Sequence, residues 1–248
     1  MEFETGIAEI IKRTPDVKSF RFQRLTGFDY APGQYLYITI LINGLKKTKP
    51  FTISSSPTET KFIEFTKRIT DHEFSIALDN SRIGDWAHIK APNGEFTFKG
   101  EYPKVVMIAG GIGITPFRSM IRYCADKAIG SEIVMLYGNR REETIAFREE
   151  LDILAKQNLK LKVVYTLSEP SDDWKGRRGY VTPQMIKEEI SDYMERVFYM
   201  CGPPAMVTSM IDVLKTLQIA AGKIRTENFF RLLTKAKCKK EKNGESRG

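Results

Sequence analysis

The sequence predicts two domains of different class: an antiparallel β-barrel with six expected strands, then an α/β domain with a doubly wound parallel sheet. Residues 1–102 contain short segments rich in β-branched and aromatic residues, separated by Gly, Pro and Asn, which is typical of a barrel. Residues 103–232 alternate apolar runs with amphipathic stretches, as βαβ units do. The change occurs at Tyr102-Pro103, so we place the domain boundary there.

Each predicted domain contains distinct strand and helix candidates. In the first, the strand candidates are SFRFQRL, GQYLYITIL, PFTISSS and FIEFTKRI, and the helix candidate is EFSIALDN (Glu73–Asn80). In the second, the strands are VVMIA, EIVMLYG, LKVVYTL and VFYMCG. The helical stretches that follow them are TPFRSMIRYCADKA, ETIAFREELDILAKQ, TPQMIKEEISDYM and AMVTSMIDVLKTL. Because ligands bind at the carboxyl ends of such parallel strands, these ends are the first places to look for a site.

The composition excludes several classes of protein. No apolar run among the 248 residues is long enough to span a membrane, and the N-terminus lacks the basic start and apolar core of a signal peptide. We therefore expect a cytoplasmic protein. Three cysteines without a C-x-x-C pair, and only two histidines, argue against a disulfide framework, an iron–sulfur cluster or any other metal site.

The C-terminal segment differs from the rest of the chain. Six Lys or Arg and two Asp or Glu lie in residues 235–248, which supply half of the net charge of +8. We predict a basic disordered tail at 233–248 because apolar periodicity is missing there. Such a tail can touch an acidic partner or nucleic acid, but a solvated terminus is the preferred interpretation, and no nucleic-acid ligand is expected.

The stretch AGGIGITP lies between an apolar strand and a helix. Gly110, Gly111 and Gly113 let the backbone approach a ligand closely. Thr115 suits the helix N-cap and Pro116 the first helical position, so that the positive end of the helix faces a diphosphate. The stretch differs from the fingerprint G-x-G-x-x-G because Pro116 replaces the third glycine. A purely structural turn is the alternative.

A second site candidate follows the last apolar strand, in VFYMCGPPAMV. We expect Cys201 to be exposed at the strand terminus, with Gly202 and Pro203 directly after it. This is where a parallel sheet binds its ligand, so Cys201 is a candidate site residue. A buried structural cysteine is the alternative.

Five motifs, in this order, resemble those of the ferredoxin–NADP(+) reductase superfamily, which joins a flavin-binding β-barrel to a nicotinamide-nucleotide domain. The resemblance covers residues 3–231, and its first motif is KPFTISSSP. By this resemblance Lys49 binds flavin phosphate, Phe51 packs on the isoalloxazine ring and Thr52 lies near flavin N5. The other cofactor-binding residues implied in this motif are Pro50, Ile53 and Ser54.

The next two motifs also lie in the barrel. FTKRITDHEFSIAL is similar to a family stretch that holds the ribityl chain and pyrophosphate, which implies binding roles for Lys67, Arg68 and Ser75. His72 replaces a family glycine there. APNGEFTF is similar to the family turn that closes the barrel.

The last motifs lie in the second domain. AGGIGITP resembles the loop that faces the pyrophosphate of the nicotinamide dinucleotide, with Thr115 close to the nicotinamide. CGPPAMV resembles C-G-P-x-x-M, which implies that Cys201 lies against nicotinamide C4 and that Met206 lines the site. Near the end, TENFF is similar to the C-terminal Glu-x-Tyr/Phe segment of the family. Its carboxylate and its aromatic residue correspond to Glu227 and Phe229. That aromatic covers the second flavin face; a plain core Phe is the alternative.

The resemblance implies hydride transfer from a nicotinamide to flavin N5 and then release of electrons one or two at a time. The catalytic residues that it implies are Thr52, Cys201, Glu227 and Phe229. The cofactors carry the redox chemistry, and the protein positions them. Thr52, Cys201 and Glu227 hold the stacked rings and relay a proton to or from N5. We expect FAD rather than FMN, because Lys67, Arg68 and Ser75 suit a pyrophosphate.

The choice between NADH and NADPH depends on residues at the end of the third strand, and two further cofactor-binding candidates end the second. Asn139 and Arg140 end the second strand of the parallel sheet, and Ser168, Glu169, Arg178 and Tyr180 follow the third. A carboxylate at Glu169 repels a 2′-phosphate and can accept a hydrogen bond from a ribose hydroxyl, whereas Arg178 favours the phosphate. We expect NADH.

The electron acceptor is not encoded in a recognisable motif. We expect a separate acceptor and a monomeric protein. An acidic ferredoxin-like protein, an oxygenase component and a small molecule all remain open, and the basic surface suits the first. Two alternatives are a reductase that uses flavin as a loosely bound substrate and a regulatory subunit that binds nucleotides without turnover.

Overall fold

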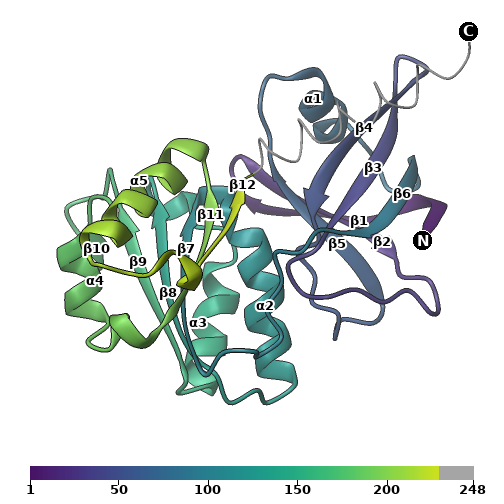
Figure 1. The fold of residues 1–248 in the computed structure, drawn as a ribbon. Coiled ribbons are helices and arrows are strands. Elements are labelled where there is room, and N and C mark those ends of the chain that lie inside the picture. The colour runs from purple at the N-terminus through teal and green to yellow at the C-terminus, as the bar shows by residue number, and fades with distance from the viewer. Residues whose placement is uncertain (229–248) are drawn as a thin grey trace, which may run out of the picture.

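The computed structural model describes residues 1–228, and they form the two domains seen in Figure 1. The first is an antiparallel sheet of six strands in the order β4-β3-β6-β1-β2-β5. Its strands are β1 (Glu2–Thr14), β2 (Val17–Gln23), β3 (Tyr35–Ile42), β4 (Leu45–Thr52), β5 (Phe62–Arg68) and β6 (Trp86–Asn93). A bridge between Ile53 and Phe65 joins the two edge strands, so the sheet closes into a barrel and the predicted class is confirmed.

Aromatic and β-branched side chains fill the barrel. Phe20, Phe65 and Ile38 are fully buried, and the Phe20 and Phe65 rings stack with their centroids 5.1 Å apart. Alternate residues of a strand point to one face, which is why the predicted pattern of large apolar residues becomes the interior. The one predicted helix is α1 (Glu73–Asp79), which lies near β4 in Figure 1.

The second domain is a six-stranded sheet in the order β10-β9-β8-β7-β11-β12, and every pair in it is parallel. Its strands are β7 (Lys104–Gly110), β8 (Glu132–Asn139), β9 (Leu161–Leu167), β10 (Arg177–Arg178), β11 (Val197–Gly202) and β12 (Ile224–Asn228). The sheet is doubly wound, as the sequence predicts. One apolar core lies between the sheet and α2 (Ile114–Asp126) with α3 (Arg148–Gln157), and another between the sheet and α4 (Pro183–Glu189) with α5 (Pro204–Thr216).

Two helices are shorter than their sequence patterns predict. The expected helix ETIAFREELDILAKQ begins only at Arg148, because Phe147 adopts a left-handed backbone conformation (φ 61°) and is buried. The stretch before it forms a 3-10 turn at Glu142–Thr144. The expected helix TPQMIKEEISDYM ends at Glu189, where Ile190 leaves the helical conformation (φ −139°, ψ 82°) and enters the core. Tertiary packing has overridden the helical periodicity at both places.

No helix among residues 1–228 combines the length and the apolar character that a membrane span needs.

Candidate functional site

A cavity of about 690 Å³ opens at the carboxyl ends of β7, β8, β9 and β11. This is the edge of a doubly wound sheet at which ligands bind. The sequence-predicted site residues that line it are Arg68, Gly110, Gly111, Asn139, Arg140, Ser168, Tyr180, Gly202, Pro203 and Met206. The fold therefore gathers candidates from both domains, because Arg68 comes from the barrel and the others come from the parallel sheet.

The glycine loop fits against its neighbours without room for side chains. Gly111 has a positive φ of 51°, and a Cβ there would lie 3.1 Å from Nη2 of Arg68. A Cβ at Gly113 would overlap the carbonyl oxygen of Cys201 and come within 2.6 Å of its carbonyl carbon. Two glycines thus allow β5 and β11 to approach this loop, and the third, Gly110, leaves room for the Met206 side chain.

The helix after the loop begins earlier than the sequence suggests. Gly111–Gly113 form a 3-10 turn that continues into α2 at Ile114, so Thr115 is not the N-cap. Thr115 is buried, and its hydroxyl donates to the carbonyl of Ile112 at 3.2 Å. Pro116 lies in the first helical turn, where its missing N–H costs nothing. Gly111 and Ile112 of the preceding turn line the cavity.

Cys201 is fully buried in the structure rather than exposed at its strand end. Burial raises the pKa of its thiol, and the charge of Glu227 acts in the same direction. Glu227 is the register partner of Cys201 on the neighbouring strand β12. The exposure prediction failed because β11 is paired on both edges at Cys201, with β7 and β12, and the Cys201 side chain belongs to the core that includes residues of α2.

We therefore expect the Cys201 thiol to stay protonated and to resist alkylation. Iodoacetamide added to the folded protein at pH 8 should leave Cys201 unmodified, because only the thiolate reacts and burial disfavours it. Peptide mass spectrometry before and after denaturation measures this directly. Modification of Cys201 in the folded protein as fast as in denaturant contradicts the buried, neutral state.

Asn139 is the polar group in the cavity that most clearly calls for a ligand. Its side chain is 8% exposed, and neither its oxygen nor its nitrogen has a hydrogen-bond partner among residues 1–228. The Tyr137 hydroxyl lies close to this amide and donates to the carbonyl of Gly111 at 3.1 Å. Buried amides in native proteins are paired, and a polar ligand in the cavity would supply partners for this one. A nicotinamide dinucleotide, which is rich in hydroxyl, amide and phosphate groups, fits that requirement.

The rim of the cavity carries a cluster of charges at the ends of β8 and β9. Glu169 accepts from Nε of Arg140 at 2.7 Å and from Nε of Arg141 at 3.3 Å. The hydrogen bond from Arg140 lowers the pKa of Glu169. Both arginines are thereby engaged by one carboxylate, which weakens their attraction for any further anion.

Arg178 lies outside this cavity, although the sequence analysis treated it as a candidate for phosphate recognition. Its Nη2 donates to the carbonyls of Ser171, Asp172 and Trp174 at 3.0, 3.0 and 3.3 Å, so it holds its own loop together. The neighbouring Tyr180 does line the cavity and is 79% exposed.

On the barrel side, the predicted flavin motif runs from β4 into the loop after it. Phe51 is half-buried and stacks on Phe65, with ring centroids 4.8 Å apart and an interplanar angle of 15°. Thr52 is buried at the end of β4, Lys49 is exposed and Pro50 is half-buried. Ile53 belongs to the barrel core.

Ser54 is the member of this motif whose side chain faces the protein. Its hydroxyl lies 2.9 Å from Oε1 of Glu64 and 2.8 Å from the hydroxyl of Thr66, and all three side chains are buried. The side chain of Ser54 therefore supports the motif from behind, and its backbone does the same, since its N–H donates to the carbonyl of Glu64 and its carbonyl accepts from Arg118.

Lys67 and Ser75 form the second predicted flavin motif. Nζ of Lys67 donates to Oγ of Ser75 and to the carbonyl of Arg68, both at 2.8 Å, and the backbone N–H of Thr70 also donates to Oγ of Ser75. Partial burial lowers the pKa of Lys67 to about 8. A partly desolvated ammonium beside a hydroxyl suits an anionic group such as a cofactor phosphate.

Phe229, the aromatic residue predicted to cover the second flavin face, lies outside the described residues.

Comparison with known proteins agrees with this two-domain arrangement. Residues 5–98 match the oxidoreductase FAD-binding domain and residues 107–212 the oxidoreductase NAD-binding domain. NADH-cytochrome b5 reductase 2 of Danio rerio is 30% identical over 227 residues, covering 77% of this chain and 73% of the relative. The chain belongs to the ferredoxin–NADP(+) reductase superfamily.

Other members of the superfamily extend the comparison. The glycine betaine monooxygenase reductase subunit of Chromohalobacter salexigens is 31% identical over 217 residues, covering 84% of this chain but only 59% of that relative. The cytochrome b5 reductase domain of Ulva prolifera nitrate reductase has the same fold, with a TM-score of 0.81, 23% identity, and coverage of 92% of this chain and 97% of that one. The chain thus spans less than two thirds of the first of these relatives.

A pair of tyrosines beside the flavin motif was not among the predicted site residues. Tyr35 is the register partner of Thr52, and its hydroxyl lies 3.5 Å from that of Tyr37. Burial, the hydrogen bond with Tyr37 and the charge of Glu227 raise the pKa of Tyr35. The stretch GQYLYITIL already indicates this pair, because Tyr35 and Tyr37 are two residues apart and residues two apart in a strand share a face.

Proposed function

We propose that the protein is a flavoprotein reductase that uses NADH, holds FAD and passes electrons to a separate acceptor. The observation that carries this proposal is the cavity at the carboxyl ends of the parallel strands, where Arg68 of the barrel meets Gly111 of the glycine loop. A nucleotide in that cavity lies at the boundary with the barrel. Membership of a family with FAD-binding and NAD-binding domains supports the same conclusion.

The residues have distinct proposed roles in holding the two cofactors. Those proposed for FAD are Lys49 to Ser54, Lys67, Arg68 and Ser75, and those for NADH are Gly110, Gly111, Gly113, Thr115, Pro116, Asn139, Arg140, Ser168, Tyr180, Gly202, Pro203 and Met206. When bound, the flavin supplies a ring that accepts a hydride from the nicotinamide and releases electrons. The buried Cys201 keeps its proton on Sγ and is therefore neutral, and the Glu227 carboxylate lies beside it on β12.

Preference for NADH follows from the charges at the cavity rim. Glu169 places a negative charge there and pairs with Arg140 and Arg141, which makes both arginines less available to a 2′-phosphate. Arg178 holds its own loop, so it does not compensate. The NADH-cytochrome b5 reductases among the relatives are consistent with this preference.

For the acceptor we propose a small acidic redox protein. Relatives include reductases named for cytochrome b5 and for an oxygenase component. Lys49 is exposed on β4, two residues before the half-buried Phe51 of the flavin motif and on the same face of the strand. Opposite charges at such a surface steer association and fix orientation.

The proposal is tested by the visible spectrum of the purified protein during anaerobic titration with NADH and, separately, with NADPH. We expect a bound-flavin spectrum that is bleached faster by NADH. A colourless protein that reduces added flavin indicates the loosely bound flavin alternative. Nucleotide binding without bleaching indicates the regulatory alternative, and faster bleaching by NADPH overturns the nucleotide assignment.

A further inference from the structure

Arg118 of α2 is a buried arginine that joins the two domains. Its side chain is 4% exposed. It forms a bidentate ion pair with Glu59, from the loop after the flavin motif, and a second ion pair at 2.8 Å with Glu150 of α3. Nη1 also donates to the carbonyl of Ser54 at 3.0 Å. One guanidinium therefore binds a carboxylate from each domain as well as the backbone of the flavin motif.

The next residue of α2, Ser119, also donates a hydrogen bond to a backbone carbonyl of the flavin motif. Ser119 is fully buried, and its hydroxyl donates to the carbonyl of Ser55 at 2.6 Å. Consecutive residues of α2 thus bind consecutive carbonyls of the segment that follows Thr52. From behind, Glu64 holds the same segment, because it accepts from the hydroxyl of Ser54 and its backbone carbonyl accepts from the N–H of Ser54. The segment is fixed on both sides.

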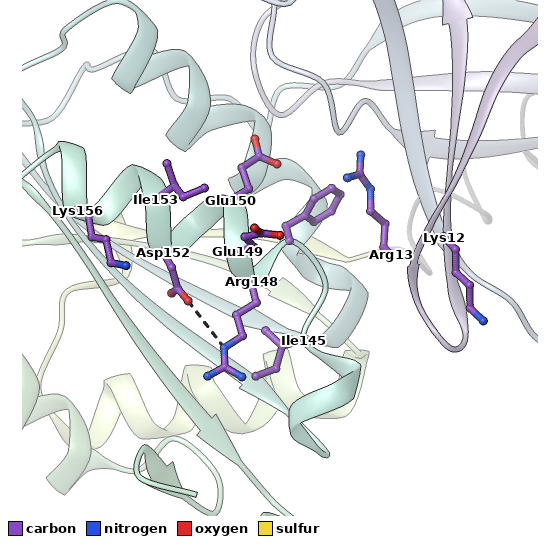
Figure 2. Close-up of a pocket in the computed structure, with 10 residues that line it drawn as sticks. Lys12, Arg13, Ile145, Arg148, Glu149, Glu150, Asp152, Ile153 and Lys156 are labelled. Atoms are coloured by element: carbon purple, nitrogen blue, oxygen red, sulfur yellow. Dashed lines mark ion pairs between the residues drawn. The ribbon is translucent and has the colours of Figure 1, made fainter.

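The surroundings of Arg118 leave little freedom for the domains to slide. The ring of Phe147 lies near two guanidinium groups, with its centroid 5.6 Å from that of Arg118 and 4.8 Å from that of Arg13, which comes from the barrel. Figure 2 shows Arg13 on the barrel side and Glu150 on the α3 side of a pocket of about 760 Å³. A shift between the domains would separate Arg118 from one of its carboxylates, and removing a partner from a buried charge is strongly unfavourable.

We propose that Arg118, with Ser119, is a positioning residue that sets the distance between hydride donor and acceptor. This inference rests on the proposed function. Arg118 lies one helical turn after Ile114, where the glycine loop enters α2. The same residue holds Ser54, two positions after Thr52. The nicotinamide loop and the flavin motif are therefore connected through a single rigid path. Hydride transfer requires the reacting atoms at about 3–3.5 Å, so a small change along this path has a large effect on rate.

The test compares Arg118→Met and Ser119→Ala with the unaltered protein in anaerobic rapid mixing with NADH. For Arg118→Met we expect the limiting rate of flavin reduction to fall by about 10²-fold, the cost of a misplacement on the order of 1 Å. The apparent Kd for NADH and the FAD content should change little, and the charge-transfer absorbance of the nicotinamide–flavin complex should weaken. Ser119→Ala, which leaves Ser55 its bond from Tyr30, should fold and show a smaller reduction of the same kind.

Arg196→Met is the matched control. Arg196 is also buried and also pairs with two carboxylates, but Asp192 and Glu132 belong to its own domain. The Arg196→Met protein should be less stable, but its limiting rate of flavin reduction per bound flavin should not change. Arg118→Lys should have a limiting rate between those of Arg118→Met and the unaltered protein, since an ammonium can keep one of the two ion pairs, with Glu59 or with Glu150.

Two outcomes overturn the inference. One is a limiting rate and charge-transfer band in Arg118→Met and Ser119→Ala equal to those of the unaltered protein. The other is a rate loss in Arg196→Met as large as that in Arg118→Met. Failure of the proposed function itself is distinguishable, because NADH would then not bleach the flavin of the unaltered protein.

Discussion

Replacing Gly113 with alanine is expected to reduce the limiting rate of flavin reduction by NADH by about 10²-fold or more. The added Cβ would overlap the carbonyl oxygen of Cys201 and lie 2.7 Å from Cα of Gly202. Both neighbours are backbone atoms, so the glycine loop or the end of β11 must move by roughly an ångström, and displacements of this size cost about two orders of magnitude. Stopped-flow reduction of the bound flavin measures the effect.

Gly222→Ala is the control for the glycine substitution. No atom lies within 4 Å of the Cβ that it would add, so neither the rate nor the stability should change appreciably. Overpacking at Gly113 should also lower the free energy of unfolding by about 1–3 kcal/mol. A Gly113→Ala protein that folds and reduces its flavin at the original rate contradicts the close approach of the loop to β11.

Replacing Glu169 with glutamine is expected to shift nucleotide preference toward NADPH. The substitution removes the carboxylate that Arg140 and Arg141 share, and their side chains are 69% and 56% exposed, so they can reach a 2′-phosphate. One new charge-assisted hydrogen bond of modest strength corresponds to about a tenfold rise in the ratio of kcat/KM for NADPH to that for NADH. Steady-state kinetics with both nucleotides gives this ratio.

Glu188→Gln provides the comparison for the Glu169 substitution. Glu188 is also a half-exposed carboxylate of the same domain, in an ion pair with Arg177 at 2.7 Å, and Arg177 does not line the nucleotide cavity, whereas Arg140, the partner of Glu169, does. The net charge of the protein changes equally in both variants. A similar rise in NADPH use by both would attribute the effect to overall charge and would remove Glu169 from the specificity site.

The class and order of the two domains could be predicted from local patterns. Strand alternation and strand–helix alternation are properties of neighbouring residues, and the carboxyl ends of the parallel strands follow from them. This is why Gly110, Asn139, Ser168 and Gly202 were candidates before the cavity was seen. The pairing of Tyr35 with Thr52 was also within reach, because β3 and β4 form a hairpin.

The features that the sequence did not disclose depend on contacts between distant segments. Cys201 is buried because β7 and β12 pair with both edges of its strand and residues of α2 belong to the same core. Thr115 fails as an N-cap because the 3-10 turn before it continues into α2. The ion pair of Arg118 with Glu59 joins residues 59 positions apart and in different domains. No local periodicity records such a pairing, and a buried arginine looks in sequence like any other exposed helical arginine.

The position of β1 within the barrel sheet constrains the order in which the nascent chain acquires structure. β1 lies between β2 and β6, and its register pairs Glu2 with Lys90. At 5–20 residues per second, the strand that completes the barrel leaves the ribosome on the order of ten seconds after the first strand. Arg118 lies about 30 residues after the start of β6, the last barrel strand, so it emerges a few seconds after that strand. The barrel can therefore be complete when α2 emerges, so the parallel sheet would assemble against a preformed surface.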